Sequence, residues 1–130
     1  MEAVPLTAFL DTHALVLLGE GRSERFGTES RRLLASVEIM VSPVVLFELH
    51  FLYEVGRWQV DPDRFYADVL SECHVRESPD PLAAVVREAT ALAWTRDPFD
   101  RLIVATAMLH GAKLVTKDAN IHEHFDGAVW

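Results

Sequence analysis

DPFDRLIVATAMLHGAKLVTKD, residues 97–118, has the pattern of a buried helix followed by a strand. Asp97 and Pro98 form a strong helix start, because Asp can cap the first turn and Pro suits the first helical position. The apolar run 102–109 must pack deep in a domain, Gly111 ends the helix, and residues 113–116 form a short strand. Acids therefore stand at the edges of the most buried elements. Burying carboxylates close together is costly unless a cation or a proton compensates.

The rest of the chain alternates short apolar runs with helices. We expect strands at residues 4–10, 38–41, 73–76, 113–116 and 128–130. We expect helices at residues 12–18, 24–36, 42–55, 61–72, 80–94, 97–111 and 119–125. This alternation predicts an α/β fold, with helices covering both faces of a short, mostly parallel sheet in a three-layer α/β/α arrangement. In such sheets, ligands bind outside the carboxyl ends of the strands.

Length and composition indicate one globular domain. A chain of 130 residues, 50% hydrophobic and 25% charged, can form one core, and no linker divides residues 1–130. The formal net charge of −8 argues against non-specific nucleic-acid binding, which needs a basic face. It does not exclude a nucleic-acid enzyme, because metal ions held by the acids would offset the charge where a substrate docks.

Cysteine content and hydropathy indicate the compartment. The single Cys73 rules out an internal disulfide and fits a reducing cytoplasm. The N-terminal residues lack the basic region of a signal peptide, and no apolar run reaches the roughly 18 residues that a membrane span requires. We therefore expect a cytoplasmic protein without a membrane partner.

Glu48 is an unusual acid on the helix at 42–55. The residues three, four and seven positions away share its face, and all are apolar: Val44, Val45, Phe51, Leu52 and Val55. This pattern predicts that Glu48 points at the interior, toward a shared metal site. The alternatives are a Glu paired with a buried Arg and a Glu at the rim of the core.

Four further acids stand at strand ends or at the start of the apolar helix. Asp11 and Asp118 follow strands, and Asp97 and Asp100 are three positions apart in a first turn. Each also has a helix-capping explanation, and the Asp-Pro pairs at 61–62 and 80–81 show that this chain uses Asp-Pro as an ordinary helix start. Capping alone explains the whole set poorly. Ligands that are all oxygen suit Mg²⁺ or Mn²⁺, which support phosphoryl transfer by an activated water.

Several segments resemble the PIN-domain ribonucleases, most closely the VapC-type toxins of prokaryotic toxin–antitoxin pairs. They are LDTHALV, SPVVLFEL, RDPFDRLIVATAMLHGAKLVTKD and the closing Trp130. The resemblance implies a PIN-like fold and a Mg²⁺-dependent endoribonuclease that is inhibited by a cognate antitoxin and forms a homodimer. It also implies an acidic site, with Thr116 as the family's supporting hydroxyl. That site consists of Asp11, Glu48, Asp100 and Asp118, with Asp97 as an additional acid whose role relative to Asp100 is open.

Basic residues that could dock RNA are few. Arg22, Arg25, Arg31 and Arg32 lie between the first two predicted strands, and their alternative is a solvated helix face. Arg96 and Arg101 stand beside the acids and are further candidates for RNA contact. The alternative for Arg101 is that it neutralises a neighbouring carboxylate.

Other functions remain as alternatives. A haloacid-dehalogenase-type phosphatase also places an Asp after its first strand, but His13 occupies the position where that family has a second Asp. A phosphoacceptor receiver domain also uses acids at strand ends, and neither class explains Glu48. A PIN-like module with weak catalysis that acts by binding a protein partner is the non-enzyme reading. His122 and His124 resemble a metal pair but lack further ligands at zinc spacing, so we expect both on the surface.

Overall fold

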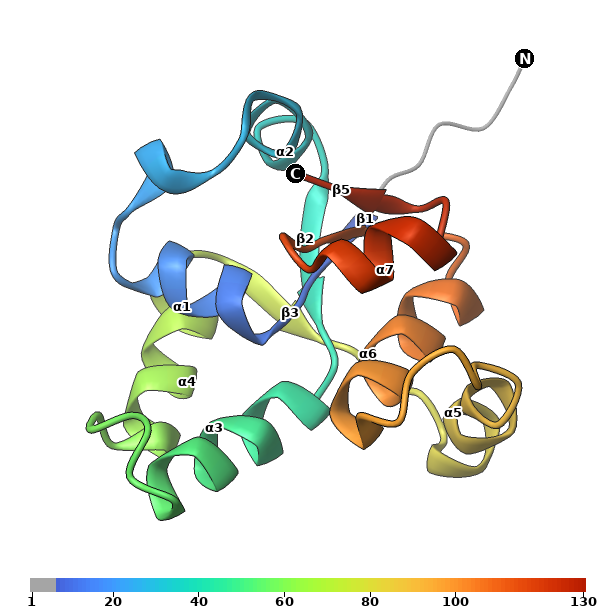
Figure 1. Ribbon diagram of the computed structural model, residues 1–130. Helices are drawn as coiled ribbons and strands as arrows, with labels where there is room; N and C mark the ends of the chain where they lie inside the picture. Colours follow the sequence, from blue (N-terminus) through green and yellow to red (C-terminus); the bar gives the residue numbers. More distant parts are fainter. Residues whose placement is uncertain (1–6) are drawn as a thin grey trace.

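The computed structural model describes residues 7–130, and a five-stranded parallel sheet forms its centre (Figure 1). The strands are β1 (Thr7–Leu10), β2 (Glu38–Val41), β3 (Val75–Glu77), β4 (Lys113–Val115) and β5 (Ala128–Val129). Their order is β3-β2-β1-β4-β5, and every neighbouring pair is parallel. The predicted α/β class is confirmed. Residues 4–6 of the first predicted strand lie outside the described residues.

Helices lie on both faces of the sheet. They are α1 (Thr12–Gly19), α2 (Thr28–Leu34), α3 (Val44–Glu54), α4 (Pro62–Glu72), α5 (Leu82–Ala89), α6 (Pro98–Leu109) and α7 (Ala119–His124), with a 3-10 turn η1 (Ser23–Arg25). Figure 1 shows α1 and α4 on one side of the sheet and α5, α6 and α7 on the other. Helix α3 lies below the carboxyl ends of the strands and packs against both α4 and α6. The space at these strand ends is therefore bordered by helices from both layers.

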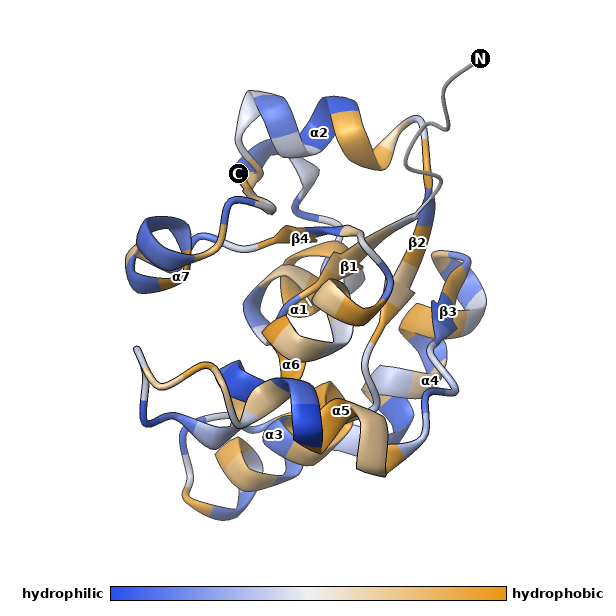
Figure 2. Cartoon of the chain, turned by 90° about the vertical axis from the view of Figure 1, so that its right-hand side faces the viewer, coloured by the Kyte–Doolittle hydropathy of each residue, from blue (hydrophilic) through white to orange (hydrophobic). Residues whose placement is uncertain are grey.

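The core lies between the central strands and α6. Phe9, Leu10 and Leu114 are fully buried, as are Ile103 and Val104 on the helix. Figure 2 shows the hydrophobic colour concentrated on the central strands and α6, whereas α7 is mostly hydrophilic. Full burial of one large aliphatic or aromatic side chain contributes about 1.5–3 kcal/mol. In residues 7–130, no helix is long and apolar enough to cross a membrane.

The predicted helix at 24–36 is wrong, because the chain breaks into η1 and α2. Phe26, between them, is buried with its ring 5.3 Å from that of Trp130. A Cβ on Gly27 would lie 2.5 Å from the backbone carbon of Trp130, so the close approach of the two segments requires glycine. A continuous helix could not make these contacts with the end of the chain.

The predicted helix at 80–94 is also too long at both ends, since α5 spans only Leu82–Ala89. At its start, the Asp80 carboxylate binds the Nε2 atom of His110 at 2.8 Å and does not cap the helix. At its end, the guanidinium of Arg101 donates to the carbonyl oxygens of Ala89 and Thr90. Tertiary partners therefore set both ends.

Candidate active site

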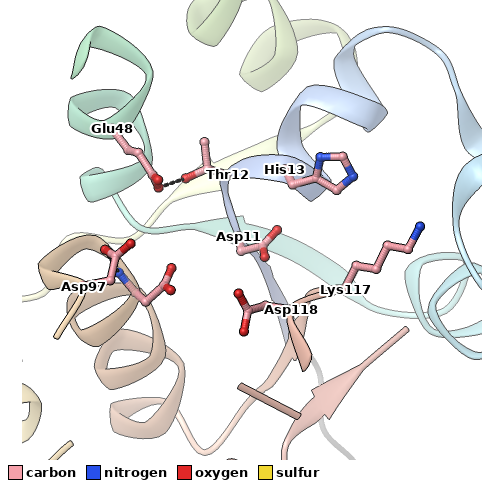
Figure 3. A pocket seen from close by; sticks show the side chains of 8 residues that line it. Asp11, Thr12, His13, Glu48, Asp97, Lys117 and Asp118 are labelled. Carbon is pink, nitrogen blue, oxygen red and sulfur yellow. Dashed lines mark hydrogen bonds between the residues drawn. The ribbon is translucent and has the colours of Figure 1, made fainter. Parts of the chain in front are cut away.

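A cavity of about 470 Å³ opens at the carboxyl ends of the strands (Figure 3). It contains all five acids that the sequence singled out, which come from β1, α3, α6 and β4. The residues that line it are Asp11, Thr12, His13, Glu48, Asp97, Asp100, Lys117 and Asp118.

Asp11 lies at the floor of this cavity, directly after β1. Its Oδ1 atom accepts a hydrogen bond of 2.8 Å from the backbone N–H of Ala14, so Asp11 caps α1. The residue is only 9% exposed, and this burial raises the pKa of its carboxyl group. The hydroxyl of Thr116 opposes that shift, and the nearby Asp118 carboxylate adds to it. The capping bond is made by Oδ1, so the second carboxylate oxygen lies outside it.

Asp118 lies next to Asp11 because β4 pairs with β1, with Val115 opposite Leu10. Its Oδ1 atom accepts a hydrogen bond of 2.9 Å from the backbone N–H of Ile121 and caps α7. Its own backbone N–H donates to the Oγ1 atom of Thr116 at 3.1 Å. Thr116 is fully buried. Its hydroxyl accepts the bond from the Asp118 backbone and opposes the rise in the pKa of Asp11, so it interacts with both acidic residues.

Asp97 and Asp100 have different roles in the first turn of α6. Asp97 is exposed, and its Oδ1 atom accepts hydrogen bonds from the backbone N–H groups of Phe99 (2.8 Å) and Asp100 (3.1 Å). Asp100 is half-buried, and burial followed by repulsion from Asp97, Asp118, Glu48 and Asp11 raises its pKa to about 7. Within residues 7–130, the Asp100 carboxylate makes no hydrogen bond. Asp97 therefore caps the helix, and Asp100 is the acid free to bind a cation.

Glu48 lies at the rim of the cavity, where Thr12 donates its hydroxyl to the Oε1 atom (Figure 3). Burial raises the pKa of Glu48, the bond from Thr12 opposes this rise, and repulsion from Asp97 and Asp11 adds to it. Glu48 is half-buried and lines the cavity together with the other acids, so its place agrees with the predicted orientation toward a shared acidic site. Its neighbours Phe51 and Val55 are 43% and 50% exposed, because this face of α3 borders the cavity and solvent.

Comparison with known proteins assigns the family. The family model described as PIN domain matches residues 8–126, which include every acid of the cavity. The chain belongs to the PIN domain family. It is 33% identical over 120 residues to Ribonuclease VapC22 of Mycobacterium tuberculosis (strain ATCC 25618 / H37Rv), covering 91% of this PIN domain and 92% of that protein.

Solved structures share the fold of this PIN domain at low sequence identity. A toxin–antitoxin complex from Klebsiella pneumoniae contains a chain with a TM-score of 0.65 and 20% identity, covering 95% of this chain and 96% of that one. VapBC2 from Rickettsia felis, bound to a DNA fragment from their promoter, gives a TM-score of 0.61 and 18% identity, covering 90% and 92%. The PIN-like fold expected from the resemblance is confirmed.

The donor set of this PIN domain fits a hard divalent cation. Its carboxylates are oxygen donors. Burial, followed by repulsion from the other acids, raises the pKa of Asp100 to about 7, and a bound cation would relieve that repulsion. Asp11 and Asp118 each keep one oxygen outside their capping bonds. Among residues 7–130, no three acidic, His or Cys side chains lie close enough to hold an ion as they stand.

The arginines proposed for RNA contact do not line the cavity. Arg22 pairs with Glu20 at 3.2 Å, and the exposed Arg25 lies in η1. Arg96 donates to the carbonyl oxygen of Ala93, and it lines a separate pocket together with Arg101. The alternative that Arg101 neutralises a carboxylate is wrong, since its guanidinium binds backbone carbonyls.

Two basic side chains do line the cavity, namely His13 and Lys117. From the sequence, His13 is a candidate for substrate contact because it follows Asp11 so closely, and its alternative is a satisfied polar residue near the site. Lys117 was not predicted. Sequence position could have identified both residues, because each lies within two positions of an acid that follows a strand.

Proposed function

We propose that this PIN domain is a Mg²⁺-dependent endoribonuclease and the toxin of a type II toxin–antitoxin pair. The observation that carries the proposal is the convergence of five carboxylates from four elements in one cavity. Membership of the PIN family and 33% identity to a ribonuclease over nearly the whole chain support it. The cytoplasm, where RNA is present, is the proposed compartment.

The acids have separate tasks in this proposal. Asp11, Asp100, Asp118 and Glu48 would hold Mg²⁺ or Mn²⁺, because their carboxylates share the cavity and Asp100 has no competing hydrogen bond among residues 7–130. The bound ion would activate the attacking water and neutralise charge on the phosphodiester, and hydrolysis would leave a 5′-phosphate and a 3′-hydroxyl. Asp97 would fix the first turn of α6, and Thr116 would orient Asp11 and Asp118.

Two protein partners belong to the proposal. The first is a cognate antitoxin, supported by structural neighbours that are described as toxin–antitoxin complexes. The second is another copy of this chain. Large apolar side chains are exposed on α3 and α5, with Phe47 and Leu82 each 70% exposed, and exposed apolar patches of this kind mark protein interfaces.

The test is cleavage of RNA by variants that keep the size of the side chain and remove the charge. Asp11→Asn and Asp118→Asn should each abolish cleavage in Mg²⁺ while the circular dichroism spectrum stays unchanged. Asp126→Asn is the matched control, because Asp126 is exposed and lies outside the cavity. Cleavage that survives either site variant, or that persists in excess EDTA, would contradict the proposal.

Calorimetric titration with Mg²⁺ or Mn²⁺ distinguishes the metal-dependent nuclease from the alternative hypothesis of a module without catalysis. A binding isotherm that is lost in Asp100→Asn supports the metal-dependent nuclease. A wild-type protein that binds neither ion would instead be a PIN-like module that works by binding its partner.

A further inference from the structure

The cavity is not uniformly acidic. Lys117 and His13 lie on one side of the central acids, and Glu48 and Asp97 lie on the other (Figure 3). Both basic residues are exposed, and neither forms an ion pair within the part of the chain that the structure describes. Burial raises the pKa of Asp11, and His13 is among the smaller effects that oppose this rise. One side of the cavity thus offers uncommitted hydrogen-bond donors.

RNA binding needs such donors more here than in a basic protein. The net charge of −8 opposes the approach of a polyanion, so attraction must come from cations close to the reacting phosphate. Three nearby arginines are already engaged: Arg22 by Glu20, and Arg96 and Arg101 by backbone carbonyls. Lys117 and His13 are the basic side chains that line the cavity itself.

Lys117 is also held in a defined place. The residue before it, Thr116, is fully buried and its backbone N–H donates to the carbonyl oxygen of Val129 at 3.0 Å. The residue after it, Asp118, caps α7. The backbone of Lys117 is therefore held at both neighbours, and its flexible side chain carries an ammonium with three donors. His13 is similarly placed, since its ring lies 6.3 Å from the ring of Trp130 at an angle of 30°.

We propose that Lys117, with His13 beside it, binds a backbone phosphate of the RNA next to the phosphodiester that is cleaved. The inference rests on the proposed function, and it adds the side of the cavity over which the RNA strand enters. The RNA strand enters over the Lys117 and His13 side, and the reacting phosphate lies among Asp11, Asp100 and Asp118. The opposite side, with Glu48 and Asp97, carries negative charge and repels phosphate.

The first experiment measures cleavage of a short fluorogenic RNA by Lys117→Ala. Lys113→Ala is a matched control, because Lys113 is an equally exposed lysine at the other end of β4, outside the cavity. We expect Lys117→Ala to raise KM by about 5- to 10-fold with kcat within about twofold of wild type, as for loss of one charge-assisted hydrogen bond. His13→Gln should raise KM in the same direction, and Lys113→Ala should match wild type.

The second experiment measures RNA binding without cleavage. Fluorescence anisotropy in an Asp11→Asn background, over a range of KCl concentrations, gives the salt dependence of affinity. Adding Lys117→Ala should reduce the slope of log K against log salt by about 0.7, the value for one phosphate contact on a single strand. Calorimetry should show unchanged Mg²⁺ affinity for Lys117→Ala, since the lysine is not a metal ligand.

The outcomes distinguish the two proposals. If Lys117→Ala behaves as Lys113→Ala in both KM and salt slope while the wild type cleaves RNA, the phosphate contact is wrong and the proposed function stands. If Lys117→Ala loses Mg²⁺ binding, the residue acts on the metal site and the inference is overturned. If the wild type neither cleaves nor binds RNA, both proposals fail.

Discussion

The Nε2 atom of His122 lies 2.6 Å from the carbonyl oxygen of Thr116. A carbonyl oxygen only accepts, so His122 donates Nε2–H to it. His122 belongs to α7, the helix that Asp118 caps, and the backbone N–H of Asp118 in turn donates to the hydroxyl of Thr116. These bonds close a ring around the turn that carries Asp118. His122 is therefore a positioning residue for the acid and for the buried hydroxyl.

Removing this bond should loosen the acidic site. We expect His122→Ala to weaken Mg²⁺ binding by about tenfold, at the lower end of the effect of losing an outer-shell partner. His122→Gln, which keeps a donor, should recover most of the affinity. Calorimetry and kcat measure both effects.

His124→Ala is the matched control for this prediction. His124 lies on the same helix and also contacts a carbonyl oxygen, but that oxygen belongs to Asn120 within the helix, and the ring of His124 stacks on Trp94. Equal Mg²⁺ affinities for His122→Ala and His124→Ala would show that the bond to Thr116 does not organise the site.

The acids could be found from the sequence because their signal is local. Asp11 and Asp118 directly follow apolar strands, and parallel strands bring their carboxyl ends to one edge of a sheet. The contacts that position the acids could not be found in this way. His122 acts on a carbonyl six positions earlier through a helix cap, and Glu48 depends on a bond from Thr12, which lies 36 positions away. Neither relationship leaves a pattern in the sequence.

The fold also combines features that local sequence encodes with features that long-range contacts decide. The positions of the strands and the helix at 97–111 follow from apolar periodicity and Asp-Pro starts, which local sequence encodes. The break before α2 depends on Trp130 packing against Phe26, and the start of α5 depends on the pair between Asp80 and His110. Long-range contacts decided both boundaries, and propensity alone favours longer helices at each place.

Thr12 should set the orientation of Glu48. Its hydroxyl donates to the Oε1 atom of Glu48 and lowers the pKa of that carboxyl group against the effect of burial. Thr12→Val keeps the shape and removes the donor, so we expect the pKa of Glu48 to rise further and Mg²⁺ affinity to fall by about fivefold, near 1 kcal/mol. Thr12→Ser should remain close to wild type in a calorimetric titration. Identical affinities for the Val and Ser variants would contradict this role.

Asp100 should make the stability of the metal-free protein depend on pH. Burial and the neighbouring carboxylates raise its pKa from 3.8 to about 7. The folded protein then holds the proton more tightly than the unfolded chain, so the stabilisation is complete below pH 3.8 and is lost as the pH rises through about 7. The pKa values of Asp11 and Glu48 shift in the same direction and add to the effect.

Thermal unfolding in EDTA measures this dependence. We expect Tm to fall as the pH rises from 3.8 to about 7, and Asp100→Asn to flatten part of the fall. The part due to Asp100 should be on the order of 1 kcal/mol, after allowance for solvent screening of a half-buried group. Mg²⁺ should restore Tm at the higher pH, because it replaces the lost proton as a positive partner. If the slope of Tm against pH is the same in Asp100→Asn as in Asp126→Asn, Asp100 is not the source of the pH dependence.

Phe47 should hold two copies of the chain together. It is 70% exposed on α3, and its ring packs 5.7 Å from that of Phe99 on α6, so the apolar surface continues from one helix to the next. We expect wild type to sediment as a dimer and Phe47→Asp as a monomer, because a buried unpaired charge in an interface costs several kcal/mol. Tyr53→Asp is the control, since Tyr53 is exposed on another side of α3. A wild-type protein that stays monomeric in analytical ultracentrifugation at the highest soluble concentration would exclude the dimer.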